Sequence, residues 1–173
     1  TITAGATQAI FTVILSCVSP GDEVIVIEPA FDCYLPAITL AGGKAICVSL
    51  DVQRNSDGLV DAYAIPWTAL ANAITPKTRL LLINSPHNPT GMVWQRSDLD
   101  RLADLLSQTN VLVCSDEVYE HMVFDGQQHH SASSHPALAA RSFVVSSFGK
   151  TFHVTGWKIG YVAAPVSLSA EFR

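Results

Sequence analysis

The feature of this sequence that most restricts its fold is the alternation of short apolar segments with segments of helical periodicity. Residues 23–27 (EVIVI) and 79–83 (RLLLI) are rich in β-branched residues and leucine, as is typical of strands buried in a parallel sheet. Residues 6–17 instead carry apolar side chains at the three- and four-residue spacing of a helix. Strands that alternate with helices predict an α/β domain with a mostly parallel sheet.

Turn residues such as Gly42-Gly43 separate the predicted elements along the chain. Strands are predicted at 23–27, 45–50, 79–83, 111–115 and 142–146, and helices at 6–17, 34–40, from Pro66 onward and at 96–107, with a polar loop at 55–58 and a helical turn at 117–121.

Ligands of such sheets bind where the strands end, among the loops and helix N-termini at the carboxyl edge. Polar side chains that follow predicted strands are therefore the first candidates for a site. They are Asn84, Asn88, Asp116, Tyr119, Ser147 and Lys150.

Composition excludes several classes of partner. The 173 residues are 49% hydrophobic and 14% charged, which fits one domain with a well-buried core. The net charge is −5 and no basic run occurs, so we expect neither nucleic acid nor a membrane surface as a partner. We also expect no membrane-spanning helix and no signal peptide. Four isolated cysteines without C-x-x-C spacing indicate reduced thiols and a cytoplasmic location.

Gly149-Lys150-Thr151 resembles the end of a nucleotide-binding phosphate loop. That loop requires another glycine five positions before Gly149, and Val144 occupies this position. A nucleotide site is thereby excluded, and Lys150 needs another explanation.

Asp116 and Lys150 each allow a structural and a chemical interpretation. Asp116 ends an apolar strand, where an unpaired charge is costly, so it requires a partner or serves as a helix N-cap. Lys150 is either a solvated surface lysine or a desolvated nucleophile, since its loop of Ser, Gly, Thr and aromatic residues is nearly uncharged.

Three motifs decide between these interpretations: residues 84–91 (NSPHNPTG), 115–120 (SDEVYE) and 146–151 (SSFGKT), the last followed by 155–160 (TGWKIG). In this order the chain resembles the class I aminotransferases, pyridoxal-phosphate enzymes of fold type I. Residues 28–34 (EPAFDCY) are most similar to the methionine and kynurenine/glutamine transaminase branch. The resemblance implies a three-layer sandwich, the large cofactor-binding domain of that fold.

The resemblance also implies a role for each residue that matches a motif. Lys150 is expected to form the Schiff base with the cofactor and to move the substrate proton, and Asp116 to pair with the pyridine nitrogen. Asn88 and Tyr119 are expected to hydrogen-bond the phenolic oxygen, and Phe31 to stack on the ring. The resemblance thus implies that Lys150, Asp116 and Tyr119 are the catalytic residues.

The cofactor phosphate is expected at the start of the first helix. Backbone N–H groups of Gly5, Ala6 and Thr7 favour a dianion there, together with the hydroxyl of Ser147 and the charge of Lys158. Many relatives carry an arginine at the Lys158 position, and lysine provides a charge without the bidentate fork.

No metal site is expected. His129, His130 and His135 lie in a polar segment, and no acid or cysteine of that segment completes a ligand set.

The chain is expected to be a fragment, residues 1–173 of a large domain, without an N-terminal segment and a C-terminal small domain. In this family an arginine of the small domain binds the substrate carboxylate, and neither Arg141 nor Arg173 lies in a matching motif. The family forms homodimers with sites at the interface, so the fragment alone is expected to be inactive.

Three functions remain open. The first is transamination between an amino acid, of methionine, glutamine or aromatic type, and a 2-oxo acid. A cysteine-conjugate β-lyase on the same scaffold is the second. The third is a non-catalytic aminotransferase-like sensor domain of a transcription regulator.

Overall fold

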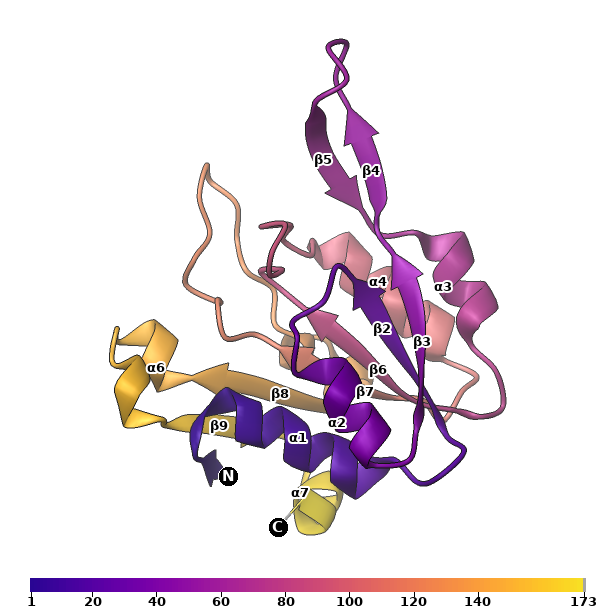
Figure 1. The fold of residues 1–173 in the computed structure, drawn as a ribbon, viewed down its shortest axis with the longest axis vertical. Coiled ribbons are helices and arrows are strands. Elements are labelled where there is room, and N and C mark those ends of the chain that lie inside the picture. The colour runs from indigo at the N-terminus through magenta and orange to yellow at the C-terminus, as the bar shows by residue number, and fades with distance from the viewer. Residues whose placement is uncertain (173) are drawn as a thin grey trace.

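A seven-stranded sheet forms the centre of the molecule (Figure 1). The computed structural model describes residues 1–172, and Arg173 lies outside the described residues. The strand order is β1-β9-β8-β7-β6-β2-β3, in which β3, β2, β6, β7 and β8 are parallel and β9 and β1 antiparallel to their neighbours. The strands are β1 (Ile2–Thr3), β2 (Glu23–Glu28), β3 (Lys44–Ser49), β6 (Thr78–Asn84), β7 (Leu112–Asp116), β8 (Ser142–Ser147) and β9 (Gly160–Ala163).

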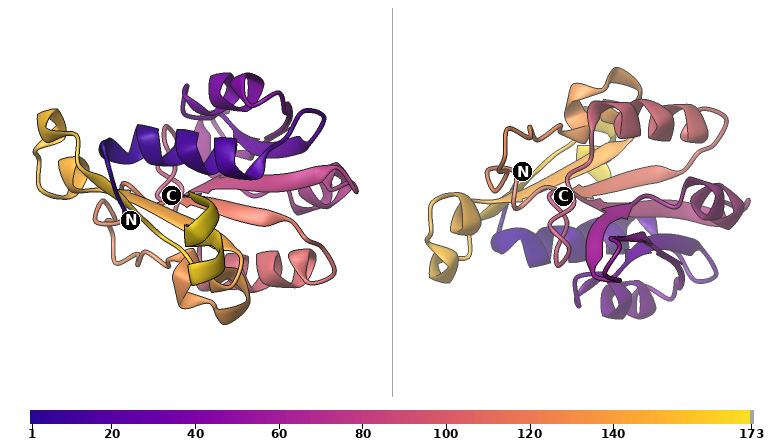
Figure 2. Two further views of the ribbon diagram at one scale, coloured as in Figure 1. Left: turned by 90° about the horizontal axis from the view of Figure 1, so that it is seen from below. Right: turned by 90° about the horizontal axis from the view of Figure 1, so that it is seen from above.

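Helices cover both faces of the sheet (Figure 2). The alternation of side chains along β6 shows why. Leu80 and Leu82 pack into one core with α1 (Gly5–Cys17) and α2 (Tyr34–Leu40), whereas Leu81 and Ile83 pack into a second core with α3 (Trp67–Ala73) and α4 (Arg96–Leu106). The predicted three-layer α/β sandwich is thereby confirmed. The first helical layer also holds α7 (Val166–Phe172), and the second also holds α5 (Pro136–Ala139).

The predicted loop 55–58 is confirmed, but other local predictions differ from the structure. The sequence did not predict the strands β4 (Asp51–Arg54) and β5 (Val60–Ala64), which flank this loop and form a hairpin that projects from the sheet (Figure 1). Residues 117–121 form a hydrogen-bonded turn rather than a helix, with the Glu120 N–H donating to the Glu117 carbonyl. The sequence did not predict four short helical elements, α5, η1 (Ala132–Ser134), α6 (Phe148–Thr151) and η2 (Thr155–Trp157).

The helices are short, and α1 has 13 residues. Within residues 1–172, none combines the length and the apolar character that crossing a bilayer requires.

Candidate active site

The carboxyl ends of β2, β6, β7 and β8 lie at one edge of the sheet because these strands are parallel. A cavity of about 630 Å³ lies at this edge. All ten residues predicted for the site line it, although they come from five separate segments of the chain. They are Gly5, Ala6, Thr7, Phe31, Asn88, Asp116, Tyr119, Ser147, Lys150 and Lys158. The structure therefore brings the predicted residues together, and their individual roles remain predictions.

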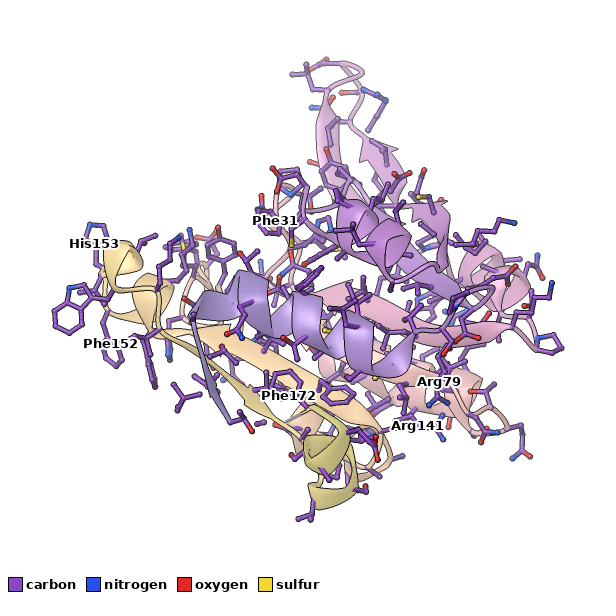
Figure 3. The ribbon with its side chains drawn as sticks, turned by 60° about the horizontal axis from the view of Figure 1, so that its bottom comes forward. Phe31, Arg79, Arg141, Phe152, His153 and Phe172 are labelled. Atoms are coloured by element: carbon purple, nitrogen blue, oxygen red, sulfur yellow. The ribbon has the colours of Figure 1, made fainter. Side chains whose placement is uncertain are left out.

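Figure 3 shows how Phe31 and two arginines lie relative to α1. Phe31 lies above the first half of α1, whereas Arg79 and Arg141 lie near its C-terminal end. The Arg141 guanidinium donates to the backbone carbonyls of Leu106 and Thr109 at 2.9 and 3.0 Å. Arg141 thus stabilises a loop at the far edge and does not face the cavity.

Asp116 is the buried charge of the cavity. It ends β7 with 4% of its surface exposed, and its Oδ2 accepts a 2.6 Å hydrogen bond from the Tyr34 hydroxyl. Its Oδ1 accepts a longer bond, 3.3 Å, from the backbone N–H of Val118. Both bonds favour the carboxylate, and the second is the local turn contact expected of an N-cap-like aspartate.

Burial outweighs these two hydrogen bonds. The pKa of Asp116 rises from 3.8 to about 6, chiefly because of desolvation, while the bonds from Tyr34 and Val118 lower it and the neighbouring Glu117 adds a smaller increase. Within residues 1–172, no lysine, arginine or histidine forms an ion pair with Asp116. Asp116 is therefore an acid whose charged form requires a cation inside the cavity.

Hydrogen bonds to the backbone carbonyl of Asp116 connect this residue to the end of β6 and the loop that follows. The Asn84 amide donates from Nδ2 to the Asp116 carbonyl at 2.8 Å, and its Oδ1 accepts from the Asn88 N–H at 2.7 Å. The Ser85 N–H donates to the same carbonyl at 3.1 Å. These bonds fix the position of Asn88 relative to Asp116 across two neighbouring strands.

The N-terminus of α1 lies against the loop that carries Lys158. A Cβ on Gly160 would lie 2.7 Å from the Gly5 carbonyl carbon and 2.8 Å from the Ala6 nitrogen, so only glycine permits this approach. Gly5 has φ +83° and Lys158 φ +54°, both in the left-handed region. The N-cap residue of α1 is Ala4, whose side chain makes no capping hydrogen bond to the first turn. This end of α1 therefore presents backbone N–H groups and a lysine to the cavity.

Lys150 differs from the expectation of a desolvated lysine. It lies in α6, directly after β8, and its side chain is exposed in this chain. Its Nζ lies 5.3 Å from the centroid of the Tyr119 ring, a cation–π distance. The expectation of a desolvated lysine was wrong because it was based on the small number of charges in the loop. Burial depends on the protein that covers a side chain, and little of this chain covers Lys150.

Comparisons with known proteins agree with this geometry. Residues 1–171 match the family model described as aminotransferase class I and II. The chain belongs to this family. It is 43% identical to the methionine aminotransferase of Escherichia coli (strain K12), over 100% of the chain and 43% of the relative. It is 41% identical to the kynurenine–oxoglutarate transaminase 1 of Mus musculus, over 99% of the chain and 41% of the relative.

Solved structures of the family superpose closely. A methionine aminotransferase structure from Escherichia coli has a TM-score of 0.90 at 44% identity, over 99% of this chain and 43% of that one. Cystalysin from Treponema denticola, which contains pyridoxal 5′-phosphate, has a TM-score of 0.90 at 26% identity over the same shares. The resemblance to the methionine and kynurenine branch is confirmed. The chain spans less than half the length of these relatives.

Pyridoxal phosphate is the cofactor of this family, and the donor set of the cavity fits it. The buried Asp116 lacks an ion-pair partner among residues 1–172, which suits a protonated pyridine nitrogen. The α1 N-terminus and Lys158 suit a phosphate dianion, and Lys150 provides a primary amine for an aldehyde. Anionic, cationic and amine groups thus occupy one cavity.

The sequence did not single out several other residues of the site. Tyr34 was assigned only to a helix, yet it forms the shortest contact to Asp116. Its place in a motif that also holds Phe31 was the available signal. Further lining residues that the sequence did not single out are Ala4, Gln8, Ile10, Phe11, Val118 and Thr155, and Asn84, a candidate from its place after a strand, also lines the cavity.

The histidine-rich segment has a structural environment. His129 donates from Nε2 to Glu117 Oε2 at 2.9 Å, and His135 Nε2 lies 3.4 Å from Asp100 Oδ1. Within residues 1–172, no three side chains of His, Cys, Asp or Glu form a group able to hold a metal ion. The acid that contacts His129 comes from outside the segment, which is why the sequence did not indicate it.

Proposed function

We propose that the protein containing this chain is a pyridoxal-phosphate-dependent transaminase. It moves an amino group between an amino acid, of methionine, glutamine or aromatic type, and a 2-oxo acid. The observation that carries the proposal is that the amine of Lys150 and the buried carboxylate of Asp116 line the same cavity. The similarity to methionine and kynurenine transaminases supports this choice of substrates.

Lys150 and Asp116 have separate roles in the proposed reaction. When bound, pyridoxal phosphate supplies an electron sink for the negative charge that develops at the substrate α-carbon. Lys150 would take the proton from that carbon as a base and deliver it as an acid to the C4′ carbon of the cofactor, as amino transfer requires. Asp116 keeps a proton on the ring nitrogen, because its charge is stable in the buried site only beside a cation.

The remaining residues orient the cofactor. Asn88 and Tyr119 donate hydrogen bonds to its phenolic oxygen, and Phe31 packs against the ring. Gly5, Ala6 and Thr7 donate from the start of α1 to the phosphate, assisted by Ser147 and Lys158. Lys158 is exposed and binds as a point charge, so it contributes attraction more than orientation.

Residues 1–173 act, in this proposal, as the large cofactor-binding domain of a cytoplasmic homodimer. The share of the relatives that the chain spans supports this assignment, as do its four free cysteines. In this proposal, protein surface outside the chain covers Lys150, which is exposed in the chain itself. The 173-residue chain alone is accordingly expected to show no turnover, and measured turnover would contradict that assignment.

The test is a product analysis of the full-length protein loaded with pyridoxal phosphate. With methionine, glutamine or phenylalanine and a 2-oxo acid, we expect a new amino acid and a new 2-oxo acid in equal amounts, and Lys150→Ala should form neither. Pyruvate and ammonia from a cysteine conjugate, without amino transfer, would instead indicate the β-lyase. A loaded protein that turns over none of these substrates would indicate the sensor domain.

A further inference from the structure

Tyr34, which has no role in the chemistry above, forms a buried pair with Asp116. Tyr34 is 3% exposed and Asp116 4% exposed, and the Tyr34 hydroxyl donates to Oδ2 at 2.6 Å. This length is typical of a charge-assisted O–H···O⁻ bond, which is about twice as strong as a bond between neutral groups. The two residues are 82 positions apart, so the contact depends on the tertiary fold.

We propose that Tyr34 is a positioning residue, whose hydroxyl orients the Asp116 carboxylate and keeps it charged for the ring nitrogen of pyridoxal phosphate. The inference rests on the proposed function, since it concerns the same site. Tyr34 donates to one carboxylate oxygen, and the weaker Val118 contact leaves the other with capacity to accept from a ligand.

The surroundings of Tyr34 favour this role. It is the first residue of α2, its N–H donates to the Phe31 carbonyl at 3.2 Å, and the two rings pack edge to face at 5.8 Å. A single turn of chain therefore carries both Phe31, predicted to stack on the ring, and the donor to Asp116. Movement of this turn would alter both contacts together.

Burial keeps the Tyr34 hydroxyl protonated. Desolvation, followed by the charge of Asp116, raises the pKa of Tyr34 well above 10, so the group acts only as a donor at neutral pH. The other titratable groups close to Asp116 are Cys33, Cys114 and Glu117, and burial raises the pKa of both thiols. Because neither the neutral thiols nor Glu117 offers a positive charge, Tyr34 is the main protein group that stabilises the charge of Asp116.

The experiment compares Tyr34→Phe with wild type in the full-length protein, using pyridoxal phosphate labelled with ¹⁵N in its ring. Without the hydroxyl, Asp116 holds a proton more tightly. We expect the ring ¹⁵N resonance to move toward that of unprotonated pyridine and cofactor binding to weaken by about tenfold, the effect of one hydrogen bond to a charged group. Tyr63→Phe, the same change on the hairpin outside the cavity, should alter neither value.

A double variant keeps the inference falsifiable if Tyr34→Phe lowers stability. In an Asp116→Asn background, Tyr34→Phe should no longer move the ¹⁵N resonance, because the charge on which it acts is gone. An unchanged resonance in the single variant would overturn the role of Tyr34 and leave the proposed function intact. A wild-type protein that binds no pyridoxal phosphate would overturn both.

Discussion

Two adjacent acids at the end of β7, Asp116 and Glu117, are both buried yet have different surroundings. Glu117 is 1% exposed and accepts from the Ser115 hydroxyl at 2.7 Å, the Ala132 N–H at 2.9 Å and His129 at 2.9 Å. Asp116 has one strong donor, Tyr34, and faces the cavity. Both carboxylate oxygens of Glu117 thus accept hydrogen bonds from the protein, whereas the charged form of Asp116 requires a cation in the cavity.

The difference separates a structural acid from a functional one. Glu117 connects the strand to the segment that carries His129 and Ala132, so its hydrogen bonds stabilise the fold. Asp116 retains capacity to accept a ligand and has a raised pKa caused by burial. Two neighbouring residues of similar chemistry are thereby assigned opposite roles, and each assignment can be tested.

The largest expected effect is on activity. Asp116→Asn in the full-length protein should lower kcat by on the order of 100-fold or more, because a neutral amide does not hold a proton on the ring nitrogen. Steady-state kinetics with methionine and a 2-oxo acid provide the measurement. Glu117→Gln is the matched control and should keep kcat within about threefold. Equal losses in both variants would remove the distinction between the two acids.

The second effect is on stability. Glu117→Ala should lower the free energy of unfolding by about 3 kcal/mol, because it leaves the Ser115, Ala132 and His129 donors without their acceptor. Denaturant unfolding of the full-length protein gives the value. Asp104→Ala, an exposed acid on α4, should change it by less than about 0.5 kcal/mol. A loss no larger than that of Asp104→Ala would show that the three hydrogen bonds do not stabilise the fold.

The third effect is a pH dependence in the cofactor-free protein. The pKa of Asp116 is about 6 in the folded state against 3.8 ordinarily, so between these values the folded state binds more protons than the unfolded state. Stability should therefore fall as pH rises from 4 through 6, by on the order of 2–3 kcal/mol from this group, and level off once the pH is well above 6. Asp116→Asn should remove this contribution, measured as the difference between variants at each pH. Parallel pH profiles would contradict the raised pKa.

The sequence predicts the sheet well where local pattern and burial agree. Apolar runs such as 79–83 became strands because both faces of the sheet are covered. Strand β9, which lies between β1 and β8, was missed because Gly160-Tyr161-Val162-Ala163 is short and follows a turn-rich segment, and its pairing with β8 depends on the tertiary fold. The hairpin at 51–64 was missed because its strands, exposed in β4 and at most half-buried in β5, lack an apolar run.

The sequence predicted which residues line the site but not the hydrogen bonds that connect them to the rest of the fold. Motif residues such as Asn88 and Lys158 line the cavity as a group. The contacts of Tyr34 with Asp116 and of His129 with Glu117 join segments 82 and 12 residues apart, and no local pattern reports such distances. The exposure of Lys150 depends on surfaces outside its own loop, so its local composition gave the wrong answer.

Borohydride reduction of the full-length protein with pyridoxal phosphate bound, followed by peptide mass mapping, tests the central claim most directly. Reduction fixes the pyridoxyl group on the lysine that binds the cofactor. The geometry of the cavity predicts the label on Lys150, with Lys158 unmodified because it binds the phosphate. A label on Lys158, on any other lysine or on none would contradict the account.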